Sequence, residues 1–197
     1  LAEVKKQISL QFGEQPLSSS NYGKIINEKH FNRISGLIDK NKVVFGGQTD
    51  SETLQISPTV MDHVTYEDKV MQEEIFGPIM PILTYDSLDE LIHKINSMPH
   101  PLALYFFTRD KVAARKVTSQ CQFGGGCIND TIIHLATSEM PFGGFGESGM
   151  GGYHGHEGFR TFSHYKSIVD KKTWLDLPMR YQPYKRINDK LIHFFLK

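Results

Sequence analysis

The sequence is poor in cysteine and carries no excess of charge, and each feature excludes a class of protein. Its two cysteines, Cys121 and Cys127, are too few for a disulfide framework and do not form a C-x-x-C pair. We therefore expect a reduced, cytoplasmic protein. Lys and Arg together number 22, as do Asp and Glu, so the basic excess typical of proteins that bind nucleic acid or anionic membranes is missing.

Long apolar runs are missing as well. A membrane-spanning helix needs roughly 18 or more consecutive apolar residues, and the apolar run at residues 191–196 is far too short. The sequence has no internal repeat and no low-complexity linker. It begins at Leu1 within a helical pattern, which predicts that it is a fragment of a longer protein.

What the sequence does contain is a regular pattern of helices and strands. Apolar spacing predicts helices at residues 1–12 and 27–40, the second presenting Phe31, Ile34 and Leu37 on one face. Strands are predicted at residues 42–45, 54–61, 79–84, 102–107 and 125–129, with residues 131–135 continuing the last strand or pairing nearby, and helices at residues 88–96 and 111–119. This order predicts an α/β fold with a mainly parallel sheet, flanking helices and a C-terminal tail that ends in a short amphipathic helix.

A glycine-dense loop spells G-x-G-x-x-G at residues 144–149. A dinucleotide-binding turn would need a strand ending at Gly144, a helix beginning at Gly149 and an acidic residue about 20 positions later. Residues 137–141 separate the loop from the nearest strand, and the glycines that follow predict that no helix begins there, because each costs a helix about 0.8–1 kcal/mol. Only Asp170 fits. The loop is either an irregular packed connection or a wall of a pocket.

A second stretch, VMQEEIFGPI at residues 70–79, places acids beside an aromatic residue and a Gly-Pro turn. A carboxylate can accept hydrogen bonds from paired hydroxyls such as a ribose diol. A phenyl ring can pack on a flat heterocycle. The same residues also fit an ordinary turn that leads into a strand.

Several motifs in order resemble one family. VMQEEIFGPI is similar to a signature of NAD(P)-dependent aldehyde dehydrogenases, and the resemblance extends over essentially the whole chain. Five further stretches resemble the class 3 branch, which includes the fatty and aromatic aldehyde enzymes: NYGKIINEKHFNRISGLI, NDTIIH, PFGGFGESGMGGYHG, TFSHYKSIVDK and LDLPMRYQPYKRINDKLIHFFLK. The resemblance implies that the G-x-G-x-x-G match is a coincidence and does not mark a dinucleotide-binding turn.

The resemblance implies that an aldehyde is oxidised to a carboxylic acid through a cysteine thiohemiacetal and thioester, with NAD or NADP as cofactor. It also implies that no catalytic residue lies in this chain, since the family's nucleophile follows a G-Q-x pattern and residues 47–50 carry Asp50 in its place. The nucleophilic cysteine and the glutamate base would lie upstream, together with the dinucleotide-binding domain. Cys121 and Cys127 fit buried structural cysteines better than nucleophiles.

Some family roles map onto residues of this sequence. Glu74 matches the glutamate that binds the nicotinamide ribose, and Phe76 matches the aromatic residue near the nicotinamide. The positions that match the aldehyde channel or lie beside it are Phe142, His154, Asn129, Leu135 and Ala136. His154 also fits a hydrogen-bonded packing histidine, and His154 with His156 gives too few ligands for a metal site.

The resemblance also predicts how the chain is organised. Residues 1–160 would be a portion of the catalytic domain and residues 161–197 a C-terminal segment that helps to form a homodimer. The partners would be a small-molecule aldehyde and a second copy of the chain, with no membrane span in this chain. The alternative is a stand-alone, non-catalytic interaction domain with the same fold.

Overall fold

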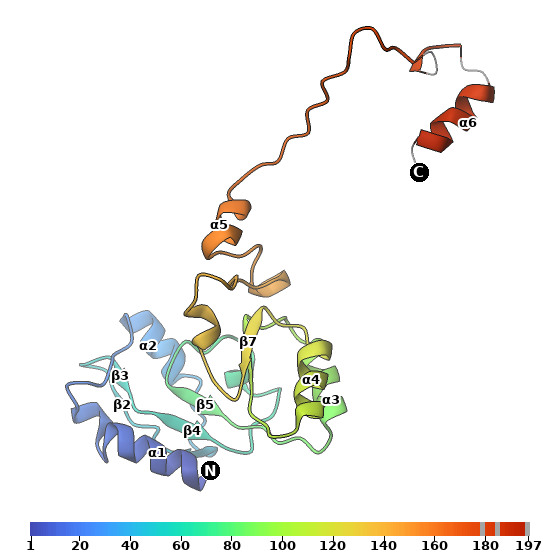
Figure 1. The fold of residues 1–197 in the computed structure, drawn as a ribbon. Helices are drawn as coiled ribbons and strands as arrows, with labels where there is room; N and C mark the ends of the chain where they lie inside the picture. Colours follow the sequence, from blue (N-terminus) through green and yellow to red (C-terminus); the bar gives the residue numbers. More distant parts are fainter. Residues whose placement is uncertain (178–179, 184–185, 196–197) are drawn as a thin grey trace. The chain divides into compact units, whose positions relative to one another are not determined.

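The structure is a computed structural model, and it describes residues 1–177, 180–183 and 186–195. The chain divides into two units, Leu1–Lys94 and Ile95–Lys197. The first unit contains a three-stranded sheet and a separate strand pair, and the second unit contains one strand pair. The strands are drawn as arrows in Figure 1. The predicted boundary at residue 160 stays a prediction.

The first unit combines two helices with short strands. Its helices are α1 (Ala2–Phe12) and α2 (Glu28–Ser35). One sheet has the order β1-β4-β5, in which β1 and β4 are antiparallel and β4 and β5 are parallel; β2 and β3 form a separate antiparallel pair. The strands are β1 (Val43–Phe45), β2 (Thr49–Asp50), β3 (Gln55–Ile56), β4 (Thr59–Met61) and β5 (Ile79–Pro81), and two 3-10 helices occupy Pro16–Ser18 and Lys69–Met71.

Helix α2 packs its apolar face into the core of this unit. Asn27 caps the helix by accepting a hydrogen bond from the amide of His30 at 2.9 Å. The predicted face is confirmed, since Phe31 and Ile34 are buried and Ile34 is fully enclosed. The buried cluster around them consists of Phe31, Ile34, Leu37, Ile56, Met61, Val64, Val70 and Ile79. The core therefore lies between α2, the three-stranded sheet and the loop that joins β4 to β5.

The second unit is built on a parallel strand pair. Strands β6 (Ala103–Phe106) and β7 (Gly125–Ile128) are parallel and are connected through helix α4 (Lys111–Gln120). Asp110 caps α4 by accepting from the amide of Val112 at 2.7 Å. Helix α3 (Leu88–Asn96) crosses the division between the units, and the remaining helical elements are the 3-10 turns Ile133–Leu135 and Gly146–Ser148, α5 (Gly155–Thr161) and α6 (Arg186–Phe195).

Several local predictions are wrong in detail. The helix expected at residues 27–40 ends at Ser35, so Leu37 lies beyond it. The strand expected at residues 54–61 is two strands, β3 and β4, with Pro58 between them. Residues 131–135 are not a strand, because positive φ angles of 59° at Asn129 and 65° at Ile132 turn the chain into the 3-10 helix Ile133–Leu135. A helix, α5, does begin in the glycine-dense region, at Gly155. There a Cβ would lie 2.4 Å from the carbonyl oxygen of Ser138, so close packing requires the glycine.

The predicted C-terminal helix is confirmed as α6, although Leu196 and Lys197 at its predicted end lie outside the described residues. Within the part of the chain that the structure describes, no helix is long and apolar enough to cross a membrane.

Alternating helices and strands with mixed pairing confirm the α/β class, with parallel pairing in β4–β5 and β6–β7 and antiparallel pairing elsewhere.

Candidate functional site

The turn at residues 74–76 lies between β4 and β5 and presents two predicted site residues to the surface. The side chain of Glu74 is exposed, and 77% of Phe76 is exposed. Phe76 has a positive φ of 47°, which costs a non-glycine residue free energy and needs support from its surroundings. The next residue, Gly77, supplies close packing, because a Cβ there would lie 2.9 Å from the Cγ2 atom of Ile34.

Arg33 of α2 holds the same turn by its guanidinium group. Nη1 donates to Glu73 Oε1 at 2.9 Å and to the carbonyl oxygen of Glu74 at 3.3 Å, while Nη2 donates to the carbonyl oxygen of Ile75 at 2.7 Å. The two consecutive glutamates are thus treated differently. Glu73 is paired, and the carboxylate of Glu74 forms no hydrogen bond or ion pair with any residue that the structure describes.

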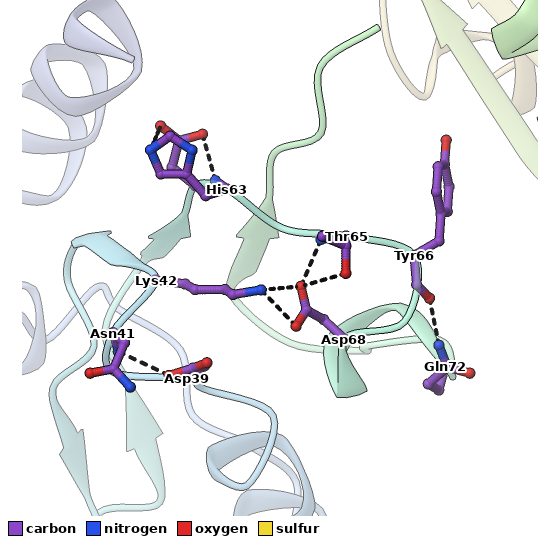
Figure 2. Close-up of polar contacts among 9 residues, drawn as sticks. Asp39, Asn41, Lys42, His63, Thr65, Tyr66, Asp68 and Gln72 are labelled. Carbon is purple, nitrogen blue, oxygen red and sulfur yellow. Dashed lines mark hydrogen bonds and ion pairs between the residues drawn. The ribbon is translucent and has the colours of Figure 1, made fainter.

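The turn belongs to the loop that joins β4 to β5, and Asp68 anchors an earlier part of that loop, as Figure 2 shows. Asp68 accepts a hydrogen bond from Lys42 Nζ at 2.7 Å on Oδ1 and from the amide of Thr65 at 2.6 Å on Oδ2. The pKa of the Asp68 carboxyl lies below its usual value because the Lys42 ammonium, and then the Thr65 amide, stabilise the carboxylate. Gln72 donates to the carbonyl oxygen of Tyr66 at 2.6 Å. The loop is therefore tied down before it reaches Glu74.

Beside the turn, Phe76 borders a surface hollow of about 420 Å³. Its other lining residues are Lys24, Ile25, Ile26 and His30. Ile26 is 83% exposed, so two large apolar side chains border this hollow without being covered within the unit. An apolar surface next to a free carboxylate suits a ligand that has both a flat ring and hydroxyl groups.

In the second unit, Phe142 and Tyr153 close the glycine-dense loop. Each donates its amide to the carbonyl oxygen of the other at 2.9 Å, which makes a two-residue antiparallel bridge. Their rings meet edge to face, with centroids 5.6 Å apart. Glycine is needed beside this bridge, because a Cβ on Gly143 would lie 2.2 Å from the carbonyl oxygen of Gly151. The backbone segments of the loop are thus packed against each other.

Two histidines join this aromatic cluster. The ring of His154 lies 6.3 Å from that of Phe142 and 4.5 Å from that of Tyr153. The ring of His134 lies 5.7 Å from Phe142, and its Nδ1 is 3.6 Å from the Sγ atom of Cys127. Nδ1 of His154 and Nε2 of His134 are buried and have no hydrogen-bond partner among the described residues. The structure thus brings Phe142 and His154 together, and their role at an aldehyde channel stays a prediction.

The other predicted channel residues do not join the cluster. The side-chain amide of Asn129 forms hydrogen bonds with the main chain of Thr108. Leu135 is partly buried and Ala136 is exposed, both at the end of the 3-10 helix Ile133–Leu135. Their roles at a channel stay predictions. A hollow of about 320 Å³ does lie over the loop, lined by Leu102, Phe142, Gly143, Gly144, Ser148, Gly149, Met150, Gly151, Gly152, Tyr153, Thr161 and Phe162.

The environment of Cys121 suits a packing role better than a catalytic one. Burial raises the pKa of the Cys121 thiol, which disfavours the thiolate that a nucleophile needs. Both cysteines are free. Among the described residues, no group of three or more His, Cys, Asp or Glu side chains is arranged to hold a metal ion.

Comparison with known proteins decides the family. The profile described as "Aldehyde dehydrogenase family" matches residues 1–168. The chain belongs to the aldehyde dehydrogenase family. One curated relative, the 4,4'-diaponeurosporen-aldehyde dehydrogenase of Staphylococcus aureus (strain NCTC 8325 / PS 47), is 46% identical over 94% of this chain and 41% of its own length. Another, aldehyde dehydrogenase family 3 member H1 of Arabidopsis thaliana, is 41% identical over 93% of this chain and 39% of its own length.

A solved structure confirms the fold. The structure described as the substrate-bound state of Staphylococcus aureus AldH superposes with a TM-score of 0.84 and 46% identity, covering all of this chain and 43% of that chain. The chain therefore spans about two fifths of the length of the relatives that it matches. These findings confirm the class 3 resemblance and the prediction that the chain corresponds to a portion of a larger aldehyde dehydrogenase.

Sequence reasoning missed Arg33, because its partners are main-chain groups that only the fold brings near. Tyr153 was noted only as a large aromatic residue of the glycine-dense loop that could help to shape a pocket. His134 was noted only as the end of NDTIIH. An arginine in the last turn of an amphipathic helix, next to the buried Ile34, is a sign that could have drawn attention to Arg33.

Proposed function

We propose that this chain supplies the cofactor-ribose turn and part of the aldehyde channel of an NAD(P)-dependent aldehyde dehydrogenase that oxidises aldehydes to carboxylic acids. The observation that carries the proposal is the pair Glu74 and Phe76. A carboxylate that forms no bond with any described residue and an exposed ring stand on one turn that is fixed by Arg33 and by the packing of Gly77 on Ile34.

The residues present fit a nicotinamide nucleotide. Glu74 would accept hydrogen bonds from both ribose hydroxyls, for which its two carboxylate oxygens offer charged acceptor sites. Phe76 would pack on the flat ring and exclude water from one of its sides. When bound, the nicotinamide supplies the two-electron oxidant. Whether NAD or NADP is used depends on a dinucleotide-binding domain that we place outside this chain, together with the nucleophilic cysteine and the glutamate base.

The aromatic cluster of Phe142, Tyr153, His134 and His154 would form one wall of the channel for the aldehyde. Its large rings suit an apolar aldehyde, since contact with apolar surface contributes about 25 cal/mol per Å². Nε2 of His134 and Nδ1 of His154, which are buried and bond to no residue in the described part of the chain, offer polar contacts within this wall.

We further propose that residues 161–197 contribute to a homodimer. Phe162, Ile168, Val169 and Trp174 are each at least 75% exposed, and this spacing of uncovered apolar side chains over a short segment is typical of an interface. A reduced, cytoplasmic location is consistent with two free cysteines and stays a prediction.

The experiment that tests the proposal is kinetic, in the complete protein that contains this chain. Glu74→Gln keeps the size of the side chain and weakens its hydrogen bonds to hydroxyls, since bonds to a charged group contribute about 1.5–3 kcal/mol. We expect kcat/KM for NAD or NADP to fall by about tenfold or more. The matched variant Glu67→Gln changes an exposed carboxylate earlier in the same loop, and it should have a much smaller effect. Equal behaviour of the two variants would refute the role of Glu74.

A further inference from the structure

We propose that Arg33 is a positioning residue for the cofactor: it fixes the main chain of residues 74–75 and pairs with Glu73, so that the carboxylate of Glu74 is the one left for the ribose. This inference rests on the proposed function of Glu74. It adds a residue that touches neither cofactor nor aldehyde and acts only through the turn.

The geometry of the guanidinium group carries the inference. Its two terminal nitrogens reach two consecutive carbonyl oxygens, of Glu74 at 3.3 Å and of Ile75 at 2.7 Å, and also the Glu73 carboxylate at 2.9 Å. Only 25% of the Arg33 side chain is exposed, so these bonds are partly shielded from water. A planar fork with several fixed donors can satisfy three acceptors at once, which a single ammonium group cannot do in the same geometry.

The pairing with Glu73 also selects between two adjacent carboxylates. Glu73 and Glu74 are adjacent, and both side chains are exposed. Arg33 holds the first, and the second forms no bond with any described residue. Because a carboxylate already bound to a guanidinium is a weaker acceptor for other donors, the pairing reserves Glu74 for an incoming ligand.

Helix α2 contacts the turn at two successive residues. Arg33 binds the main chain on one side of Phe76, and Ile34 packs against Gly77 on the other. Phe76 itself has a positive φ of 47°, a conformation that a phenylalanine keeps only when its neighbours are held. Loss of the Arg33 bonds would therefore let the turn relax and move both Glu74 and Phe76.

Lys42 provides the matched control. It also ties the loop between β4 and β5 to the rest of the unit, through Asp68, and it is equally shielded, with 23% of its side chain exposed (Figure 2). Its contact lies at the far end of the loop, several residues before Glu74. A merely structural role predicts that breaking either anchor has the same consequences, whereas a positioning role predicts that only Arg33 affects cofactor kinetics.

The test compares four variants of the complete protein: Arg33→Met, Arg33→Lys, Lys42→Met and Glu74→Gln. For each variant we would measure the KM for NAD or NADP, kcat and Tm. We would also measure the primary deuterium isotope effect on the reaction with a 1-deuterated aldehyde. Arg33→Met should raise the KM for the cofactor about tenfold, equivalent to about 1.4 kcal/mol, and should raise the isotope effect, because the reacting groups are held less well. Arg33→Lys should recover part of the loss. Lys42→Met should lower Tm and leave the kinetics within about twofold of the unmodified protein.

A double variant completes the test. If Arg33 acts through Glu74, adding Arg33→Met to Glu74→Gln should change the cofactor KM by much less than it does alone, since the two substitutions remove one shared function. Cofactor kinetics that change with Glu74→Gln but not with Arg33→Met would overturn this inference and leave the proposed function intact. No change with Glu74→Gln would overturn the proposed function itself. Equal kinetic losses in Arg33→Met and Lys42→Met would reduce Arg33 to a structural anchor and overturn the inference.

Discussion

The side-chain amide of Asn129 pairs with the main chain of Thr108 as one strand pairs with another. The amide of Thr108 donates to Asn129 Oδ1 at 2.7 Å, and Asn129 Nδ2 donates to the carbonyl oxygen of Thr108 at 2.8 Å. These two bonds follow directly on the parallel pair β6–β7, whose last partners are Phe106 and Ile128. The amide thus extends the pairing by one step while the backbone of Asn129, with φ of 59°, turns away.

The first prediction follows from this pairing. Asn129→Ala should destabilise the second unit by about 1–3 kcal/mol, because it removes two hydrogen bonds of about 0.5–1.5 kcal/mol each and places an alanine at a positive φ. Asn129→Gly removes the same bonds and tolerates the φ angle, so it should cost less. Hydrogen exchange at the Thr108 amide measures the effect locally. Unchanged protection of that amide in both variants would show that the pairing contributes nothing.

The second prediction concerns acid stability and Asp68. The pKa of Asp68 is lowered in the folded protein by Lys42 and by the Thr65 amide. Its bonds therefore stabilise the fold above the unfolded pKa of about 3.9, and this contribution is lost as the pH falls through the lowered folded value. The difference in Tm between the unmodified protein and Asp68→Asn should shrink as the pH falls from 6 to about 2. A difference that stays constant over this range would contradict the assignment.

The third prediction concerns the aldehyde. Phe142→Ala should lower kcat/KM for bulky apolar aldehydes by about one to two decades, since a buried aromatic contact is worth about 1.5–3 kcal/mol. Small aldehydes should lose much less, and the KM for the cofactor should barely move. Phe145→Ala is the matched control, because that ring lies in the same loop but contacts the tilted ring of His100, with centroids 4.7 Å apart. A uniform loss for all aldehydes, or a large rise in the cofactor KM, would instead support a dinucleotide-binding loop.

The fourth prediction concerns assembly. Val169 is 88% exposed in the described structure and lies within the apolar segment that we assign to the dimer. Val169→Asp places a charge where an interface would bury it, so the complete protein should shift toward monomer in sedimentation velocity. Asp170→Asn, at the neighbouring position, removes a negative charge and should leave the dimer intact. A dimer that resists Val169→Asp would place the interface elsewhere.

The sequence predicted the parts of the fold that depend on local pattern. Helix α2 follows from the spacing of Phe31 and Ile34, although it ends at Ser35 and does not reach Leu37, and α4 follows from its cap at Asp110. Local pattern could not show that residues 131–135 turn away from the sheet, because their apolar content also suits a strand and the deciding contact is the amide of Asn129 with a residue 21 positions earlier.

The candidate site shows the same limit. Glu74 and Phe76 were found from a motif, and Phe142 and His154 from a resemblance. The structure adds the residues that hold these side chains in place. Arg33 lies 41 and 42 positions from the carbonyl groups that it binds, and no periodicity relates residues so far apart. The neighbourhood of Phe142 likewise depends on a bridge to Tyr153 that forms only because Gly143 admits the facing backbone.

The central claim is that Glu74 binds the nicotinamide ribose and Phe76 packs beside the nicotinamide. A crystal structure of the complete protein with NAD or NADP tests it most directly, through the distances from the Glu74 carboxylate oxygens to the ribose hydroxyls. We predict both hydroxyls within hydrogen-bond reach of that carboxylate, at about 2.5–3.0 Å, with the Arg33 bonds to residues 74–75 still in place. A bound cofactor whose ribose hydroxyls are held by other residues, with Glu74 turned to solvent, would contradict the account.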